Sequence, residues 1–436
     1  MVAYAIERGN RLNATPPPCR VRWPVLQSGT WQRNLAVLWV GEVLAIAGFQ
    51  IALPFLPYYV QELGITAEGQ IAFWSGMVIS SQAVTMALIA PVWGSLADRY
   101  GRKIMVVRAM LGGAVILTLM GLARNVYQLV LLRAIQGLLT GTVPAATALV
   151  ASSAPPERRG TAIGILRVAV YLGSSTGPLI GGLIADRLGM RAAFYVTGAL
   201  LLVAGVLVSI LVQEHFEPPA EEPEGGAQKP RLWDGVALVL RTPALLSIFS
   251  VRVTMNTAFR MIAIVLPLYI QSIAGPEIRV ASFTGLIMGL ASATSAGAAM
   301  VLGRLGDRFG SRRILMVCGA AACALYALMA GTHTLTQLLI VRAIAGAALG
   351  GILASISVLL ADLVPQNRFG AVYGVDTSMM ALANALGPML GAAVAANWGL
   401  PSAFVGAAAM YGLATVVVAI LVHGPSRRSG SQRSGA

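Results

Sequence analysis

Apolar stretches long enough to cross a membrane recur along the whole chain and limit its possible folds more than any other feature. A transmembrane helix needs about 20 mostly apolar residues. The residues are 57% hydrophobic and 11% charged, whereas a soluble domain has roughly 25% charged residues. We therefore predict an all-α integral membrane protein with twelve spans, at residues 35–60, 71–96, 104–123, 128–153, 161–186, 192–213, 244–272, 282–304, 313–331, 336–363, 371–396 and 402–422.

Lys and Arg are distributed unevenly between the two ends of these spans. Most of the 31 basic residues lie before the first span, in the loops after even-numbered spans, or after the last span. The opposite end has only Arg124, Arg187, Arg191 and Arg279. By the positive-inside rule, both termini are predicted to be cytoplasmic. The net charge of +14 is thus explained by orientation in a lipid bilayer, and we expect no nucleic-acid partner.

A polar segment divides the spans into two sets of six. Residues 214–233 are acidic and rich in Pro and Gly, a composition typical of a disordered linker. The predicted organisation is an N-terminal cytoplasmic arm, a six-helix bundle, a cytoplasmic linker, a second six-helix bundle and a cytoplasmic tail, at residues 1–34, 35–213, 214–243, 244–422 and 423–436.

The two halves repeat one another at an offset of 209 or 210 residues. Residues 94–103 match residues 303–312, and Arg133 with Ile135 and Gly137 has its counterpart around Arg342. Gly177-Pro178 likewise matches Gly387-Pro388. Such internal similarity indicates a duplicated unit. Parallel repeats in transporters bind their substrate between the halves near the membrane midplane.

These motifs make the chain resemble the twelve-helix drug:proton antiporters of the major facilitator superfamily. Residues 94–103 resemble the family signature between helices 2 and 3, and residues 133–137 resemble the helix 4 signature. Gly173–Gly182 follows the helix 5 pattern GxxxGPxxGG of antiporters, and Gly48 with residues 54–57 fits the drug-exporter branch. The resemblance implies two pseudo-symmetric six-helix bundles in a bacterial inner membrane. It also implies a monomer that exports small drug-like compounds by alternating access, with protons as the coupling ion and no cofactor or metal.

The signature after the second span places Asp98 at a helix end among cations. A carboxylate there can cap a facing helix N-terminus or pair with a cation. In the family resembled, this acid helps hold the cytoplasmic side closed. The latch residues so implied are Gly94, Asp98, Arg99, Gly101 and Arg102, with Asp307 and Arg308 in the second half. The alternative is a solvated, positively charged loop.

The fifth span concentrates glycine in a way that would break a helix in water. Gly and Pro both disfavour helix interiors, but in membranes glycines let two helix backbones approach closely and neighbouring helices satisfy the groups freed by Pro. We predict a closely packed helix, bent at Pro178, beside the boundary between the halves. Its role would be to seal that boundary against proton leak through Gly173, Gly177, Pro178, Gly181 and Gly182.

Charged residues inside the first and fourth spans suggest proton coupling, because buried charge in a membrane tends to be functional. Glu42 lies about eight residues into the first span, roughly 12 Å deep. It is predicted to carry protons or contact a cationic substrate; alternatively it is a structural acid paired with Arg. Arg133 is predicted to act on a carboxylate, with Glu42 the nearest by element and Gln136 orienting it, or else to be structural.

The seventh span carries Arg252, Asn256 and Arg260 at a spacing that puts all three on one helix face. They are predicted to line a water-filled cavity and favour an anionic or hydrogen-bonding part of a substrate, or to balance Glu42. Arg252 could instead snorkel to the cytoplasmic surface. Asp376, near the start of the eleventh span, is predicted to join the proton path or to pair near the interface.

Aromatic residues complete the expected cavity, with Phe49 and Phe259 as candidates. Tyr58 and Tyr59 lie at a helix end, where an interfacial belt is the ordinary expectation. The chain lacks the Gly-x-x-x-x-Gly-Lys-Ser/Thr pattern of ATP hydrolysis, so we predict a secondary transporter rather than an enzyme. A proton symporter importing a metabolite and a non-transporting receptor or scaffold remain as alternatives. The helix 5 pattern disfavours the first, and the buried charges disfavour the second.

Overall fold

The structure is a computed structural model that describes residues 30–214, 216, 232–275, 278–364 and 369–421. Twelve of its helical segments are long and apolar enough to cross a membrane, which confirms the predicted all-α membrane fold. The first span runs from Thr30 to Glu62. A short 3-10 turn, Leu53–Phe55, interrupts it where Pro54 begins the Pro-rich end of the helix.

Six spans form the N-terminal half. Their elements are α2 (Thr30–Ala52), η1 (Leu53–Phe55), α3 (Leu56–Glu62), α4 (Glu68–Tyr100), α5 (Arg102–Gly121), α6 (Val126–Leu139), α7 (Thr142–Ser153), η2 (Pro156–Arg158), α8 (Arg159–Leu188) and α9 (Met190–Leu211). The fourth span is two helices, because Gly141 between α6 and α7 has a φ of 124°, a conformation that glycine adopts readily. Pro178 lies inside the continuous helix α8.

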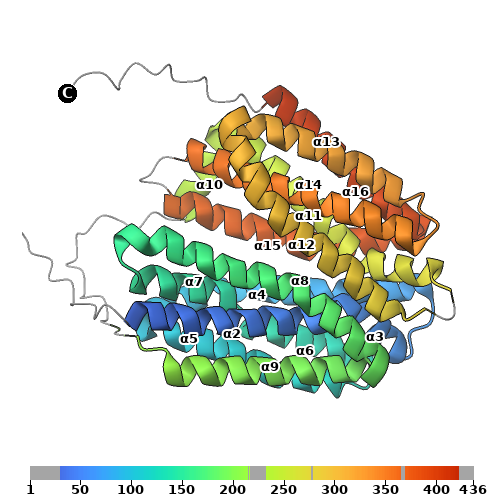
Figure 1. The fold of residues 1–436 in the computed structure, drawn as a ribbon, viewed down its shortest axis with the longest axis horizontal. Helices are drawn as coiled ribbons and strands as arrows, with labels where there is room; N and C mark the ends of the chain where they lie inside the picture. The colour runs from blue at the N-terminus through green and yellow to red at the C-terminus, as the bar shows by residue number, and fades with distance from the viewer. Residues whose placement is uncertain (1–29, 215, 217–231, 276–277, 365–368, 422–436) are drawn as a thin grey trace, which may run out of the picture.

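The C-terminal half repeats this plan, but its first and fourth spans are uninterrupted helices. Its elements are α10 (Leu232–Arg241), α11 (Pro243–Ile273), α12 (Val280–Phe309), α13 (Ser311–Met329), α14 (Leu335–Leu363), α15 (Phe369–Trp398) and α16 (Leu400–Leu421). Figure 1 shows the two halves as bundles lying one against the other, the first in blue to green and the second in yellow to red. The face holding Thr30 and Leu421 is called the terminal face here, and the opposite face the distal face.

Equivalent hydrogen bonds recur in the two halves at the offset seen in the sequence. The Thr85 hydroxyl donates to the Ala134 carbonyl at 2.8 Å, and Thr294 donates to Ala343 at the same distance. The Tyr59 hydroxyl donates to the Ala123 carbonyl, just after α5, at 3.4 Å, and Tyr269 donates to the equivalent Thr332 carbonyl at 2.6 Å. These bonds tie neighbouring helices within one half, so the duplication extends to packing as well as to sequence.

Two described parts of the predicted linker at residues 214–243 make contacts with the rest of the protein, whereas residues 215 and 217–231 lie outside the described residues. The Glu214 carboxylate accepts hydrogen bonds from the backbone amides of Arg102 and Lys103 at 2.9 and 2.8 Å. It thereby satisfies two of the free amides at the start of α5. The last ten residues before the seventh span form α10, whose Val239 is buried in the C-terminal core. Composition alone did not reveal these tertiary contacts.

Candidate functional site

A cavity of roughly 350 Å³ lies between the two halves. Its walls come from α2 and α8 on one side and from α11, α12, α14, α15 and α16 on the other. Apolar side chains such as Met255 and Met288 form much of the lining, while Gln50 and Ser174 supply polar groups from the N-terminal half. A mostly apolar cavity with a few polar groups is the usual form of a small-molecule site.

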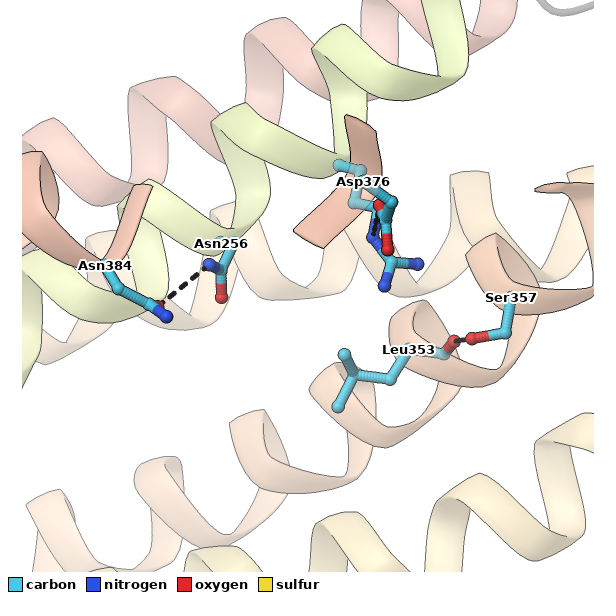
Figure 2. Close-up of polar contacts among 6 residues, drawn as sticks. Asn256, Leu353, Ser357, Asp376 and Asn384 are labelled. Carbon is cyan, nitrogen blue, oxygen red and sulfur yellow. Dashed lines mark hydrogen bonds and ion pairs between the residues drawn. The ribbon is translucent and has the colours of Figure 1, made fainter. Parts of the chain in front are cut away.

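The polar stripe of α11 faces this cavity, because Arg252, Asn256 and Arg260 all line it. Arg252 Nε lies 2.7 Å from Asp376 Oδ1 on α15, forming an ion pair. The Asn256 amide donates to Asn384 Oδ1 on the same helix at 3.3 Å. Figure 2 shows both contacts at the join between α11 and α15. Arg252 is therefore paired inside the protein rather than snorkelled to the surface.

Arg260 is the deepest cation of the stripe, about midway along α11. No described residue forms a hydrogen bond or ion pair with its guanidinium, and its Nε is buried. The guanidinium carbon lies 5.7 Å from the centre of the Phe259 ring. Behind it, a Cβ at Gly387 would come within 2.6 Å of the Arg260 Cβ. Close packing of α15 therefore fixes the position of the Arg260 Cβ, while the guanidinium charge of Arg260 has no partner among the described residues.

Arg342 of α14 adds a third cation to the lining. Its guanidinium donates to the Tyr326 hydroxyl at 2.6 Å. The counterpart in the first half, Arg133, is buried and donates to Gln136. Ala345 occupies the position of that Gln in the second half. A tyrosine from α13 therefore supplies the acceptor that the sequence repeat lacks.

Glu42 is fully buried in α2, and neither of its carboxyl oxygens has a hydrogen-bond partner. The neighbouring Gly41 faces Val208 of α9 and Met110 of α5. Among the described residues, no hydrogen bond or ion pair joins Glu42 to Arg133. The predicted pairing of these two groups is therefore not formed in this conformation, and Glu42 does not line the cavity.

Three aromatic expectations need correction. Phe49 does not line the cavity but packs against the N-terminal core, where its ring faces Gly113. Tyr58 and Tyr59 are buried rather than interfacial. The Tyr59 hydroxyl donates to the Met120 carbonyl of α5 at 2.9 Å, and Tyr58 crosses between the halves. Helix position alone predicted a membrane surface for these two tyrosines, but the second half covers Tyr58, and α5 and α9 of the same half cover Tyr59.

Polar contacts close the distal face between the halves. The Tyr58 hydroxyl donates to the Pro267 carbonyl at 2.7 Å and lies 2.8 Å from Thr284 Oγ1. The side-chain amides of Gln61 and Gln271 exchange hydrogen bonds at 2.8 and 3.1 Å. In the described part of the chain, every hydrogen bond between the halves lies from mid-span toward this face.

Asp186, at the end of α8, caps a helix of the other half. Its carboxylate accepts hydrogen bonds from the backbone amides of Ala281 and Ser282 at 3.3 and 2.6 Å, in the first turn of α12. These amides have no partner within their own helix, and a negative charge there interacts favourably with the helix dipole. The contact therefore stabilises closure of the distal face.

The glycines of α8 bring two other helices close to its backbone. A Cβ at Gly177 would lie 2.7 Å from the Ala47 carbonyl oxygen of α2, and one at Gly181 would overlap with the next turn of that helix. On another face, a Cβ at Gly182 would overlap with the Ala281 carbonyl oxygen of α12. Any side chain at these positions would force the helices apart. The glycines therefore allow α8 to pack closely against α2 of its own half and against α12 of the other half.

The predicted latch residues make no described contact between the halves. Gly94 faces open space, and Asp307 is exposed. The Arg99 and Arg308 guanidinium groups lie over the rings of the residues that follow them, and the Asp98 side chain lies outside the described residues. Gly101 has a φ of 96°. The amide of Arg102, bonded to Glu214, belongs to the linker contact already described.

Asp186, Asn384 and Tyr326 were missed in the sequence. A signal for Asp186 exists, because the spacing Asp-Arg-x-Gly occurs at residues 98–101, 186–189 and 307–310. In all three places the glycine has a positive φ and ends a long helix. Asn384 and Tyr326 carried no such pattern, because each acts through a partner on a different helix.

The fold and the cavity define a class of protein: a membrane transporter made of two equivalent six-helix halves around a central site, and not an enzyme. The Major Facilitator Superfamily model matches residues 38–283 and 280–436 of this sequence. The chain therefore belongs to the Major Facilitator Superfamily.

Comparisons with individual proteins agree with this assignment. The chain is 36% identical to the "Multidrug resistance protein MdtG" of Enterobacter lignolyticus, over 86% of this chain and 88% of that protein. It is 38% identical to the protein of the same name from Serratia proteamaculans, over 86% and 90%. The solved structure of nucleoside transporter NupG matches with a TM-score of 0.71 at 16% identity, over 89% of this chain and 98% of that chain. At that identity the likeness shows the fold alone.

Proposed function

We propose that this chain expels small amphipathic compounds across a bacterial inner membrane in exchange for protons, by alternating access. The observation that carries the proposal is the cavity between the halves, which has a mixed apolar and charged lining and is closed by polar contacts on its distal side. The names of the relatives support a drug-like substrate. In the opposite conformation, the distal contacts would separate and the terminal face would close.

The distribution of positive charge supports placing the terminal face in the cytoplasm. The loops that carry most of the Lys and Arg, such as residues 99–103 and 308–313, lie at that face. Substrate would then enter the cavity from the cytoplasm or the inner leaflet. The latch residues of these loops would meet the other half only in the outward-open conformation, in keeping with their exposed positions here.

Proton coupling is proposed at Glu42. A buried carboxylate without a partner is strongly unfavourable, so binding a proton removes an uncompensated charge. Glu42 lies on the same helix as Gln50, which lines the cavity. A displacement of α2 would therefore link occupancy of the cavity to the exposure of Glu42. Substrate and proton would compete through this movement rather than for one atom.

Everted membrane vesicles provide the test, because respiration makes their interior acidic. A pH-sensitive dye should report loss of the gradient when a transported compound is added. Glu42→Gln should abolish this response, a loss of about 100-fold or more in coupled transport for removal of an essential proton-transfer group. Glu62→Gln, an exposed carboxyl near the distal face, is the matched control and should respond like the unmodified protein.

Two outcomes would contradict the proposal. One is a pH response that is the same in Glu42→Gln as in the unmodified protein, and the other is no pH response of the unmodified protein to any compound of a broad drug panel. A response of opposite sign, with acidification strengthened by substrate, would favour the symporter. Retained binding of a fluorescent compound by Glu42→Gln would show that the variant is folded.

A further inference from the structure

The charges of the cavity belong to one half only. Arg252, Arg260 and Arg342 line it from α11 and α14. The N-terminal wall contributes Gln50, Tyr171 and Ser174 among its polar groups but no charged side chain. The cavity therefore presents three cations on one wall and an uncharged surface on the other.

Only one of these three cations is balanced. Asp376 pairs with Arg252 at 2.7 Å, and this is the single ion pair between side chains of the described residues. Arg342 donates to a neutral partner, the Tyr326 hydroxyl. Arg260 has no hydrogen-bond or ion-pair partner among the described residues. Two guanidinium charges are thus held in the cavity wall without a counter-charge from the residues that the structure describes.

Glu42 does not supply the missing negative charge. It lies outside the lining of the cavity, and its oxygens contact no donor in the described structure. A buried unpaired charge is costly and is normally retained only where a partner arrives. An arginine stays charged throughout, so the cavity cannot relieve the imbalance by losing a proton. Since no described acid pairs with Arg260 or Arg342, a bound ligand is the natural source of the counter-charge.

We propose that the cavity binds amphipathic organic anions, with a carboxylate, sulfonate or phosphonate group at Arg260 and Arg342. This inference rests on the proposed export function and names the substrate class of the same site. A guanidinium presents several N–H donors in a plane, which matches the paired oxygens of such groups. Met255, Phe259 and Met288 provide an apolar surface for the body of the ligand. Methionine adapts to varied apolar shapes.

Two fluorescent probes that differ by one group test the proposal. They are 1-anilinonaphthalene-8-sulfonate and the uncharged N-phenyl-1-naphthylamine, measured against the full chain in lipid nanodiscs with empty nanodiscs subtracted. The sulfonate should bind more tightly than the amine by about 10- to 100-fold, the range for hydrogen bonds to a charged group. Arg260→Gln should remove most of that preference and leave binding of the amine within about twofold.

Two further variants make the test specific. Arg260→Lys keeps the charge but not the planar donors, so it should retain part of the preference. Arg124→Gln removes an exposed arginine far from the cavity and should change neither affinity. Binding of the amine serves as the measure of folding in every variant.

The two proposals fail in different ways. Equal affinity for both probes, or an equal loss of both in Arg260→Gln, overturns the anion site while vesicle transport of other compounds still supports export. A preference for the sulfonate without any substrate-induced pH response would instead support the anion site and contradict proton-coupled export.

Discussion

The two crossings between the halves, α8 with α12 and α4 with α15, occupy equivalent places in the repeat but differ in closeness. A Cβ at Gly285 of α12 would overlap with the Pro178 carbonyl oxygen. At the equivalent Gly76 of α4, it would lie 3.3 Å from the Pro388 carbonyl oxygen. Likewise Gly182 of α8 corresponds to Ala392 of α15. The first crossing is backbone against backbone, and the second would admit a methyl group after shifts of only a few tenths of an ångström.

The polar contacts of the two crossings differ as well. Asp186 caps α12, whereas its counterpart in the repeat is Ala396, which packs near Gly69 of α4. The second crossing has instead one hydrogen bond, from the Ser80 hydroxyl to the Ala385 carbonyl at 2.5 Å. One crossing thus combines close glycine packing with a charged cap, and the other has Ala392 and Ala396 at the equivalent positions. Closure of the distal face therefore depends more on α8 and α12 than on α4 and α15.

Adding one methyl group at equivalent positions should give the largest difference. Gly285→Ala forces apart two backbones, and overpacking of this kind costs about 1–3 kcal/mol. We expect distal closure and transport to fall about 5- to 150-fold. Gly76→Ala is the matched control and should lose much less, because its Cβ would lie 3.2 to 3.4 Å from its neighbours, which need to shift by only a few tenths of an ångström.

Disulfide crosslinking measures this closure. Gln61→Cys and Gln271→Cys, in a chain with the three native cysteines changed to serine, should crosslink only when the distal face is closed. Equal crosslinking yields for Gly285→Ala and Gly76→Ala would show that the two crossings are equivalent and would remove the basis of the comparison.

Removing the cap should have an intermediate effect. Asp186→Asn deletes a charge at the start of α12, worth about 0.3–2 kcal/mol, so closure should weaken by a few fold in the same crosslinking assay. Glu68→Gln changes an exposed carboxylate at the start of α4, on the same face, and should have no effect. A loss of closure in both variants would point to a general charge effect rather than to capping.

Removing the hydroxyl of the second crossing should have the smallest effect. Ser80→Ala deletes one hydrogen bond between helices, worth roughly 0.6 kcal/mol in a membrane protein. The crosslinking yield should therefore change by less than about threefold. A larger loss than that of Asp186→Asn would reverse the order of the two crossings.

The fold was largely predictable because hydrophobic length and repeat register are local properties of the sequence. All twelve spans were expected, and the structure differs mainly by dividing the fourth span and ordering parts of the linker. The stripe of α11 was also predictable, since helical spacing determines which residues share a face. Its partners Asp376 and Asn384 were not predictable from spacing, because they lie on another helix, and Phe49 was misplaced because helical periodicity does not say which neighbour covers a face.

By itself, the sequence determined the membrane environment, the duplication and the family, because length, composition and motif order follow directly from residue types. Only the tertiary structure decided which charges are paired. It joined Arg252 to Asp376, left Arg260 and Glu42 without a hydrogen-bond or ion-pair partner among the described residues, and placed Asp186 on the first turn of α12. Pairing depends on contacts between residues far apart in the chain, and small differences such as Gly182 against Ala392 decide how closely the helices that carry those residues can approach.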